Sequence, residues 1–505
     1  MRTFLPRRRF SGGAAGWCLW LAAGLLQAAL PDPKPLGFIR SNTPAATPYF
    51  LQDSGKPGPL VFISGGVHGD EPAGAGAADQ IRHWPIVRGK IVVLPRANAE
   101  ALPARKRLTP GADTNQNNLN RNFPRAQQNE PPRGELAAEI WALLKQFKPD
   151  WVIDLHEGSD FRIQTTNSVG SSLIVVQKEA GKQAAALMHE AVNATITNAA
   201  RQFMLLRSPV DGSLARAAGE HLNAQAMILE TTIKAQPLSQ RIRQHRVMVH
   251  TLLRHLGMID ESVTTEWMTD QRPDRARRQI AVYDAAGTSG PGVSRLHEIA
   301  GASARLQAVP IGPEDIVRGA LSQFDALICP GGTGSGQAAA LGETGRRQVK
   351  QFVEAGGGYV GICAGAFLAC DGFSWGLKIL NARTVSPQWR RGTGTVRVEL
   401  TEAGKKILGE ANGLLEIRYA NGPILTNATS TELPAYETLA WFRSELAENN
   451  SPKGIMINSP AMVAAPCGQG RVLCLSPHPE QAKGLEKMVE RGIEWAAGNR
   501  RPPSP

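Results

Sequence analysis

Short apolar runs alternate with stretches of helical periodicity through the first half of the chain. Apolar residues recur at helical spacing in two stretches, 135–147 and 241–256. Five runs predict strands, at 60–64, 90–94, 151–155, 173–176 and 227–229. This alternation predicts an α/β domain with a mostly parallel sheet. Its working loops should lie beyond the carboxyl ends of the strands.

The same alternation begins again after a polar stretch at 262–278, which contains Pro273 and several arginines. Apolar runs at 280–283, 326–329 and 359–362 predict a second series of strands. Near the end, 462–465 and 471–475 flank a short Gly-containing turn and predict a hairpin. The predicted organisation is a leader at 1–30, a domain at 31–261, a linker at 262–278, a second domain at 279–497 and a disordered tail at 498–505.

Length and composition agree with two globular domains. The chain has 505 residues, of which 42% are hydrophobic, enough for two separate cores. Lys and Arg number 56 against 44 Asp and Glu, a formal net charge of +12. Part of this excess stands in short runs within the leader and the linker, so we interpret it as targeting and solvation. We therefore expect no nucleic-acid partner.

The first 30 residues have the features of an export signal. A basic start is followed by an apolar stretch at 14–30, with small residues at Ala28 and Ala29 suited to cleavage. Arg7-Arg8-Arg9-Phe10 is close to a twin-arginine pattern, and an ordinary secretory signal is the alternative. No later run reaches the roughly 18 apolar residues of a spanning helix. We expect an exported protein, periplasmic or extracellular, with no stable membrane span after signal cleavage.

All cysteines beyond the leader lie in the second half. They are Cys329, Cys363, Cys370, Cys467 and Cys474. Because five is odd, at least one thiol is unpaired within the mature chain or bridged to another molecule. Cys370 follows Cys363 by seven residues on the same predicted helix, and we expect it to be a core residue, with a redox neighbour of Cys363 as the alternative.

Polar residues at three predicted strand ends form a candidate zinc site. His68 and Glu71 stand in His-Gly-Asp-Glu directly after the strand at 60–64, and His156 ends another strand. Two imidazoles and one carboxylate are a frequent catalytic zinc set, which leaves a position open for water. Glu230, at the end of a further strand, can serve as general base. Hydrogen-bonded loop histidines are the alternative interpretation, and Asp154 or Glu157 can orient a ligand.

Between these ligands lies Asn120-Arg121-Asn122-Phe123-Pro124. With this motif, 58–256 resembles the zinc carboxypeptidase superfamily, in particular its succinylglutamate desuccinylase/aspartoacylase branch. The resemblance implies a mixed sheet with flanking helices, a Zn²⁺ cofactor, and a substrate carboxylate bound by Asn120 and Arg121. It also implies that Arg107 polarises the scissile carbonyl, with Arg105 as the alternative. Digestive carboxypeptidases of this superfamily cover the substrate with a Tyr, but no Tyr occurs here between Tyr49 and Tyr283. This difference favours N-acyl amino acids or small cell-wall peptides as substrates over the C-terminal trimming of proteins.

The second half contains a candidate thiol site. The predicted strand at 359–362 runs into Gly361-Ile362-Cys363-Ala364-Gly365 and then a helix, a nucleophile elbow with cysteine as nucleophile. His478 follows another strand and can act as base, oriented by Glu480. The Gly-rich loop at 331–336 can offer backbone N–H groups to an oxyanion.

These motifs, over about 278–495, resemble class I glutamine amidotransferase-like domains and specifically the biotin-protein ligase N-terminal domain. The resemblance implies a flavodoxin-like, doubly wound sheet. No ligase catalytic domain and no synthase domain is evident in the sequence, so a thiol hydrolase and a non-catalytic module both stay open for this half.

The sequence thus predicts an exported zinc-dependent hydrolase that cleaves an amide next to a carboxylate. Its substrate is expected to be a small peptide or N-acyl amino acid. The catalytic candidates are Glu230 in the first half and Cys363, His478 and Glu480 in the second. A ligand-binding or sensing protein without turnover is one alternative, and a thiol amidase centred on Cys363 is another.

Overall fold

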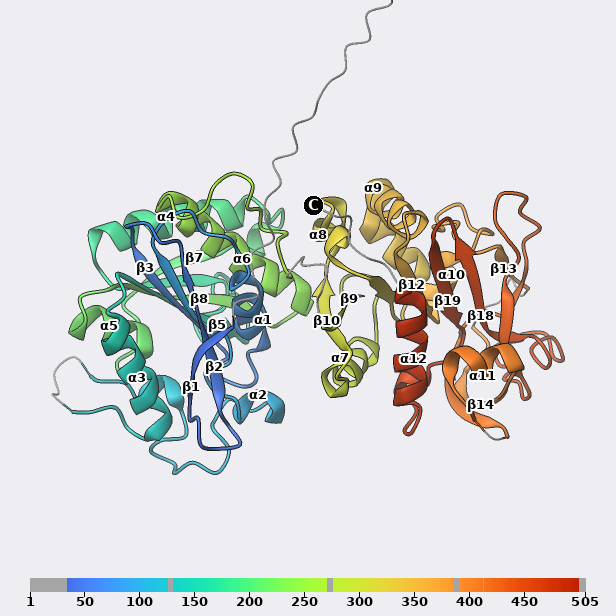
Figure 1. Ribbon diagram of the computed structural model, residues 1–505, viewed down its shortest axis with the longest axis horizontal. Helices are drawn as coiled ribbons and strands as arrows, with labels where there is room; N and C mark the ends of the chain where they lie inside the picture. Colours follow the sequence, from blue (N-terminus) through green and yellow to red (C-terminus); the bar gives the residue numbers. More distant parts are fainter. Residues whose placement is uncertain (1–33, 126–129, 270–275, 386–389, 412, 499–505) are drawn as a thin grey trace, which may run out of the picture.

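A computed structural model describes residues 34–125, 130–269, 276–385, 390–411 and 413–498. Two α/β halves lie side by side, coloured blue to green and yellow to red in Figure 1. The predicted leader at 1–30 and almost all of the predicted tail lie outside the described residues. In the part of the chain described, no helix has the length and apolar character needed to cross a membrane.

The first half is built on a mixed eight-stranded sheet in the order β1-β2-β4-β3-β5-β8-β6-β7. Its central strands β4, β3, β5 and β8 run parallel, and β6 is antiparallel to β8. The strands are β1 (Pro35–Ile39), β2 (Thr47–Asp53), β3 (Leu60–Gly65), β4 (Lys90–Leu94), β5 (Trp151–Gly158), β6 (Ser172–Val175), β7 (Met204–Arg207) and β8 (Gln225–Thr232).

Helices cover both faces of this sheet. The helices are α1 (Pro72–Ile81), α2 (Ala101–Ala104), α3 (Glu135–Phe147), α4 (Glu179–Asn193), α5 (Leu214–His221) and α6 (Leu238–His255), with 3₁₀ turns η1 (Leu119–Arg121) and η2 (Ala199–Arg201). Buried residues of α1, α4 and α6 form one core with one sheet face. Those of α3 and α5 form a second core with the other face.

The second half has a nine-stranded sheet in the order β10-β9-β11-β12-β19-β18-β17-β14-β15. The first five strands are parallel, and β18, β17, β14 and β15 extend the sheet antiparallel. The strands are β9 (Arg278–Tyr283), β10 (Leu306–Ile311), β11 (Ala326–Cys329), β12 (Gly358–Ile362), β14 (Thr393–Leu400), β15 (Leu415–Ala420), β17 (Glu437–Phe442), β18 (Pro460–Cys467) and β19 (Gly470–Leu475). A separate pair consists of β13 (Ala382–Thr384) and β16 (Leu425–Asn427).

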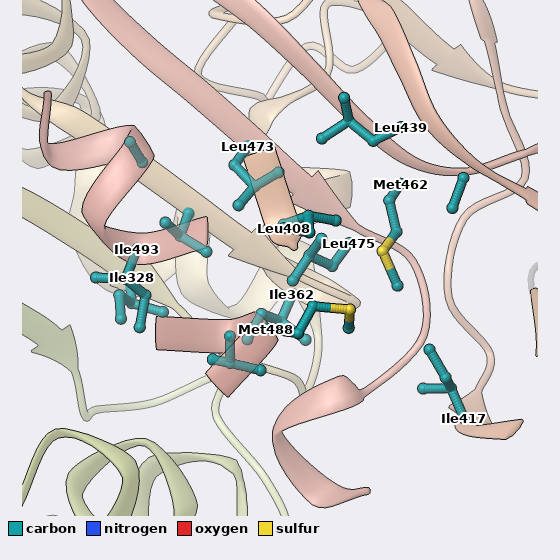
Figure 2. Packing of buried hydrophobic residues seen from close by; sticks show 14 of the residues in the cluster. Ile328, Ile362, Leu408, Ile417, Leu439, Met462, Leu473, Leu475, Met488 and Ile493 are labelled. Carbon is teal, nitrogen blue, oxygen red and sulfur yellow. The ribbon is translucent and has the colours of Figure 1, made fainter. Parts of the chain in front are cut away.

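Helices also cover both faces of the second sheet. They are α7 (Gly292–Ala302), α8 (Pro313–Val317), α9 (Gly334–Glu354), α10 (Ala364–Ala369), α11 (Glu402–Leu408) and α12 (Glu486–Ala497), with 3₁₀ turns η3 (Ala320–Gln323) and η4 (Pro479–Gln481). Figure 2 shows one of the two cores, where Met488 and Ile493 of α12 pack with Ile328, Ile362 and Leu473 of three parallel strands. The apolar side chains of these strands thus fix the ends from which the functional loops leave.

The predicted fold class is confirmed, because both halves are α/β with a sheet between helices. The predicted strand at 90–94 and the predicted helix at 135–147 have the observed bounds, and the predicted hairpin is β18–β19. The predicted strand at 151–155 continues for three residues, to Gly158, which places His156 inside β5. Helix α10 ends at Ala369, so Cys370 caps the helix instead of lying within it.

Candidate metal centre and thiol site

The ends of two neighbouring strands bring the predicted zinc ligands together. His68 lies in the turn after β3, Glu71 stands at the N-cap of α1, and His156 lies near the end of β5. One ligand atom from each of these residues lies within 4.8 Å of the others, and all three residues are buried. The neighbouring parallel strands β3 and β5 pair Gly65 with Leu155, which sets the two histidines at the same edge of the sheet.

Both imidazoles present Nδ1 to the same carboxylate. His68 Nδ1 is 2.8 Å from Glu71 Oε1, and His156 Nδ1 is 2.8 Å from Glu71 Oε2. The other ring nitrogen of His156, Nε2, is 2.8 Å from Asp154 Oδ2. The other oxygen of Asp154, Oδ1, accepts a hydrogen bond from Ser64 Oγ at 2.6 Å. Outer carboxylates of this kind fix the tautomer and orientation of histidines that bind a metal. The donor set therefore fits a divalent cation such as zinc.

The charges at this centre are those of a cation site. Burial alone would raise the pKa of Glu71, but His156 and His68 hold it well below its usual range. Burial alone would lower the pKa of His156, whereas Asp154 and Glu71 raise it well above its ordinary value. Metal binding at this centre should therefore depend on pH, because metal ligands must give up their protons.

Glu230 faces the same centre from β8. It pairs in register with His156 of the adjacent parallel strand β5. Its side chain is buried, and its Oε2 atom has no hydrogen-bond partner. Burial, together with Glu71 and Asp154, raises the pKa of Glu230 to about 8, against the opposing effect of His156 and Arg107. A carboxylate with one uncommitted oxygen and a pKa near neutrality suits a general base.

Two of the three predicted substrate-binding residues present guanidinium groups to this centre. Arg107 donates to Glu71 Oε1, whereas Arg105 extends to Glu298 of the second half at 3.1 Å. The structure thus places Arg107 at the centre and Arg105 away from it. Arg121 is held by its own neighbour, donating to the carbonyl of Asn120 at 2.6 Å.

Both polar atoms of the Asn120 side chain have hydrogen-bond partners within the protein. Its Oδ1 accepts the N–H of Leu214 at 3.1 Å, and its Nδ2 lies 3.3 Å from His156 Nε2. These contacts join the turn η1 to the start of α5 and to the metal centre. Asn120 therefore positions Arg121 beside the predicted zinc ligands.

The predicted nucleophile elbow has a strained backbone. Cys363 stands between β12 and α10 with φ 51° and ψ −98°, a region that residues with a Cβ rarely adopt. Gly361 and Gly365 make the turn possible, because a Cβ at Gly361 would lie 2.5 Å from the carbonyl oxygen of Gly365. The elbow lifts the thiol out of the sheet, and Sγ lies 3.3 Å from the Ala420 carbonyl.

His478 and Glu480 complete the thiol site. Glu480 Oε1 is 2.8 Å from His478 Nδ1, and both side chains are buried. Burial alone would lower the pKa of His478, but hydrogen bonds with Cys363 and Glu480 raise it to about 10. Gly331 of the Gly-rich loop passes so close that a Cβ there would lie 2.5 Å from His478 Cε1. The loop, the thiol and the imidazole are thus in contact.

Two family models match parts of the chain, one in each half. Residues 57–256 match the family model of the succinylglutamate desuccinylase/aspartoacylase catalytic domain, a family of amide-bond hydrolases. Residues 279–385 match that of the biotin-protein ligase N-terminal domain. The chain thus matches two family models in series. Both resemblances inferred from the motifs are confirmed. We call the two halves the desuccinylase-like domain and the ligase-N-like domain.

Solved structures similar to the chain share little sequence with it. Tripeptide-bound cell shape determinant Csd4 of Helicobacter pylori is 19% identical over 47% of this chain and 66% of its own, with a TM-score of 0.37. A succinylglutamate desuccinylase/aspartoacylase of Rhodobacter sphaeroides is 19% identical over 43% of this chain and 60% of its own, with a TM-score of 0.31. The chain thus spans just under two thirds of the Csd4 structure. No curated protein sequence matches the chain.

A cavity of about 360 Å³ opens onto the metal centre of the desuccinylase-like domain. His68, His156 and Glu230 line its inner end. The remaining lining residues are four arginines and an apolar wall, namely Arg107, Arg121, Arg162, Arg207, Val169, Ile174, Leu206, Val210 and Ile228, together with Asn120 and Ser208. The cavity therefore suits an anionic molecule that also has an apolar part.

Sequence reasoning missed two of these arginines. Arg207 ends the edge strand β7, and Arg162 lies in the loop after β5, where it donates to the carbonyl of Thr166 at 2.6 Å. Neither belongs to a motif, so no pattern in the sequence pointed to them. A prediction of the sheet order, with β6 and β7 beyond β8, would have brought Arg207 near the site.

The ligase-N-like domain has a cavity of about 530 Å³. Cys363 and His478 line it with Phe367, Trp375 and the Gly-rich loop, and Arg390 and Arg418 add positive charge. The five cysteines of the second half are all buried and form no disulfide. Burial raises the pKa of Cys370 to about 12, in keeping with the predicted core role.

Proposed function

We propose that the protein is an exported, zinc-dependent hydrolase that cleaves an amide bond next to a carboxylate. One observation supports this most strongly. The buried His68, Glu71 and His156 converge at one point, and the uncommitted carboxylate of Glu230 faces them from the neighbouring strand. The family match of the surrounding domain supports the same reaction class.

In this proposal His68, Glu71 and His156 hold the zinc ion. When bound, zinc polarises the scissile carbonyl and lowers the pKa of water to near 7. Glu230 takes the proton from the attacking water and transfers it to the leaving amine. Arg107 stabilises the negative charge that develops on the carbonyl oxygen, and Arg121 binds the substrate carboxylate.

The substrate in this proposal is a small peptide or an N-acyl amino acid. Arginine is suited to carboxylates because its planar fork binds both oxygens, and four arginines line a cavity too small for a folded protein. One similar structure is described as an mDAP-bound D,L-carboxypeptidase, and another contains a bound tripeptide. These ligands agree with a cell-wall peptide as one source of substrate.

The proposed location outside the cytoplasm rests on the leader alone. Its basic start, apolar stretch and small residues at Ala28 and Ala29 are those of an export signal. Buried cysteines without disulfides are compatible with a secreted protein, because burial in the core protects thiols such as Cys329, Cys370 and Cys474.

A second candidate function belongs to the ligase-N-like domain. The strained Cys363, the His478–Glu480 pair and the adjoining cavity favour a thiol amidase over a passive fold. In such a reaction Sγ attacks the amide carbon and His478 protonates the departing amine. Water then cleaves the thioester and returns the proton, which releases the acid and restores the thiol.

A substrate panel with three proteins tests these functions together. Wild type, Glu230→Gln and Cys363→Ala are incubated with peptidoglycan fragments, their amidated forms and N-acyl amino acids, and the products are identified by mass spectrometry. We expect hydrolysis next to a carboxylate by wild type and Cys363→Ala but not by Glu230→Gln. Loss of all turnover in Cys363→Ala alone would instead favour the thiol amidase. No turnover by any protein, with ligands that still raise the Tm, would favour a binding protein.

A further inference from the structure

Helix α6 of the desuccinylase-like domain begins without a cap of its own. Its N-cap residue is Pro237, and no side-chain cap hydrogen bond is formed there within the helix. The first N–H groups of a helix need acceptors, and a carboxylate at this end also interacts favourably with the helix dipole. An 18-residue helix that packs on the sheet therefore needs a partner at its start.

The other domain supplies this partner. Asp284 directly follows β9 of the ligase-N-like domain, and its Oδ2 accepts the N–H of Ser239 at 3.0 Å. The Ser239 hydroxyl donates in turn to the Asp284 carbonyl. Both residues are buried. Figure 1 shows α6 on the side of the first domain that faces the second, where it contacts β10. Asp284 thus caps α6 across the domain boundary.

The first turn of α6 is also linked to the metal centre, through Glu157. Arg241 donates to Glu157 Oε1, and the other oxygen of Glu157 accepts the N–H of Ala73 at 2.7 Å. Ala73 lies in the first turn of α1, whose N-cap residue is Glu71. The N–H of Glu157 donates to Glu71 Oε2 at 3.1 Å. Glu157 therefore bonds both to the backbone of α1 just after Glu71 and to the Glu71 carboxylate, and Arg241 fixes the Glu157 side chain.

We infer that Asp284 is a positioning residue through which the ligase-N-like domain fixes the metal-binding carboxylate of the other domain. Asp284 holds the start of α6, α6 holds Arg241 against Glu157, and Glu157 holds Glu71. The inference rests on the proposed function, since it takes Glu71 to be a zinc ligand. It gives the second domain a role in the first site that does not depend on chemistry at Cys363.

Zinc affinity of the full-length, metal-free protein tests the inference. Zinc is titrated against a chromophoric chelator for wild type, Asp284→Ala and Asp284→Asn. We expect the Kd of Asp284→Ala to rise about 10-fold, since changes beyond the ligands commonly cost 10- to 100-fold. Asp284→Asn keeps an acceptor oxygen and should recover part of the affinity. Amide hydrogen exchange at 238–242 should speed up in the metal-free Asp284→Ala protein.

Glu298→Gln is the matched control, because it removes another contact between the domains, the exposed pair of Arg105 and Glu298. Its zinc affinity should equal that of wild type. An Asp284→Ala protein with wild-type zinc affinity, or a Glu298→Gln protein with the same loss, would overturn the inference.

A double-mutant cycle tests the route through Glu157. Glu157→Gln alone should weaken zinc binding, and adding Asp284→Ala should weaken it by less than the sum of the two single effects. Additive losses would contradict the route. If wild type itself bound no zinc, the proposed function would fail, which separates that outcome from failure of the inference alone.

Discussion

At the residue scale, the proposed hydrolysis depends on the side chain of Glu230 as general base. Its Oε2 has no hydrogen-bond partner and its pKa is raised to about 8, so it is free to exchange a proton. We predict that Glu230→Gln lowers kcat by about 10² to 10⁴, the usual contribution of a general base, and changes KM little. Steady-state kinetics and bound-zinc measurements on the same sample check this. Loss of zinc together with activity would instead make Glu230 a ligand.

His478 gives a pH-dependent prediction. Its pKa is about 10 in the folded protein against an ordinary value of 6.5, because its partners outweigh burial. The stabilisation from the imidazolium is therefore complete below pH 6.5 and is lost as the pH rises through about 10. Glu480→Gln removes the charged partner at 2.8 Å and should cost about 2 kcal/mol at pH 6.

The difference in Tm between wild type and Glu480→Gln, followed from pH 6 to pH 10, measures this dependence. It should shrink steadily as the pH rises. A difference that grows with pH would contradict the assigned protonation state.

At the scale of elements, the strand-to-helix elbow stores strain at one residue. Cys363 has φ 51°, which glycine adopts readily and alanine does not. We predict that Cys363→Gly is more stable than Cys363→Ala by about 1 kcal/mol, the reverse of the usual order. Both variants lack sulfur, so lost thiol contacts cancel in the comparison. Urea unfolding with equal m values checks the order, and greater stability of the alanine variant would refute the strain.

The sequence predicted the elements that carry the chemistry, because strand ends and motifs coincide. His68 follows a strongly apolar strand, and His156 and Glu230 lie near the ends of two others; parallel pairing brings such ends together. The antiparallel strands β14, β15 and β17 were not predicted, although Val396, Val398 and Leu400 alternate with exposed residues in β14. The roles of Arg207 and Arg241 were not predicted for another reason. Each depends on contacts with residues far away in the sequence, which no local pattern encodes.

At the scale of the whole molecule, the two domains share a buried charge cluster. Asp315 Oδ1 of α8 accepts from Arg243 at 2.7 Å and from Arg246 at 2.8 Å, both on α6. Glu266 accepts from Arg243 as well. Asp315 and Arg246 are each 1% exposed, so neither charge has water as an alternative partner. The cluster fixes α6 to the ligase-N-like domain.

Removal of Asp315 should therefore be costly. Asp315→Ala leaves two buried guanidinium groups with too few acceptors, and we predict a loss of about 3 to 5 kcal/mol. Calorimetry should show a lower Tm, and limited proteolysis should cut the chain between the domains sooner than in wild type. Loss of the exposed Arg105–Glu298 pair should cost less than about 1 kcal/mol. Equal effects of the two changes would mean that the cluster does not join the domains.

The central claim is that His68, Glu71 and His156 bind the zinc on which hydrolysis depends. Zinc content after chelation and back-titration, measured together with amide hydrolysis on wild type and His68→Ala, tests it most directly. We expect one zinc ion per wild-type chain, activity that is lost with the metal and restored by it, and neither zinc nor activity in His68→Ala. Full hydrolysis by metal-free wild type, or a His68→Ala protein that binds zinc and hydrolyses as wild type does, would contradict it.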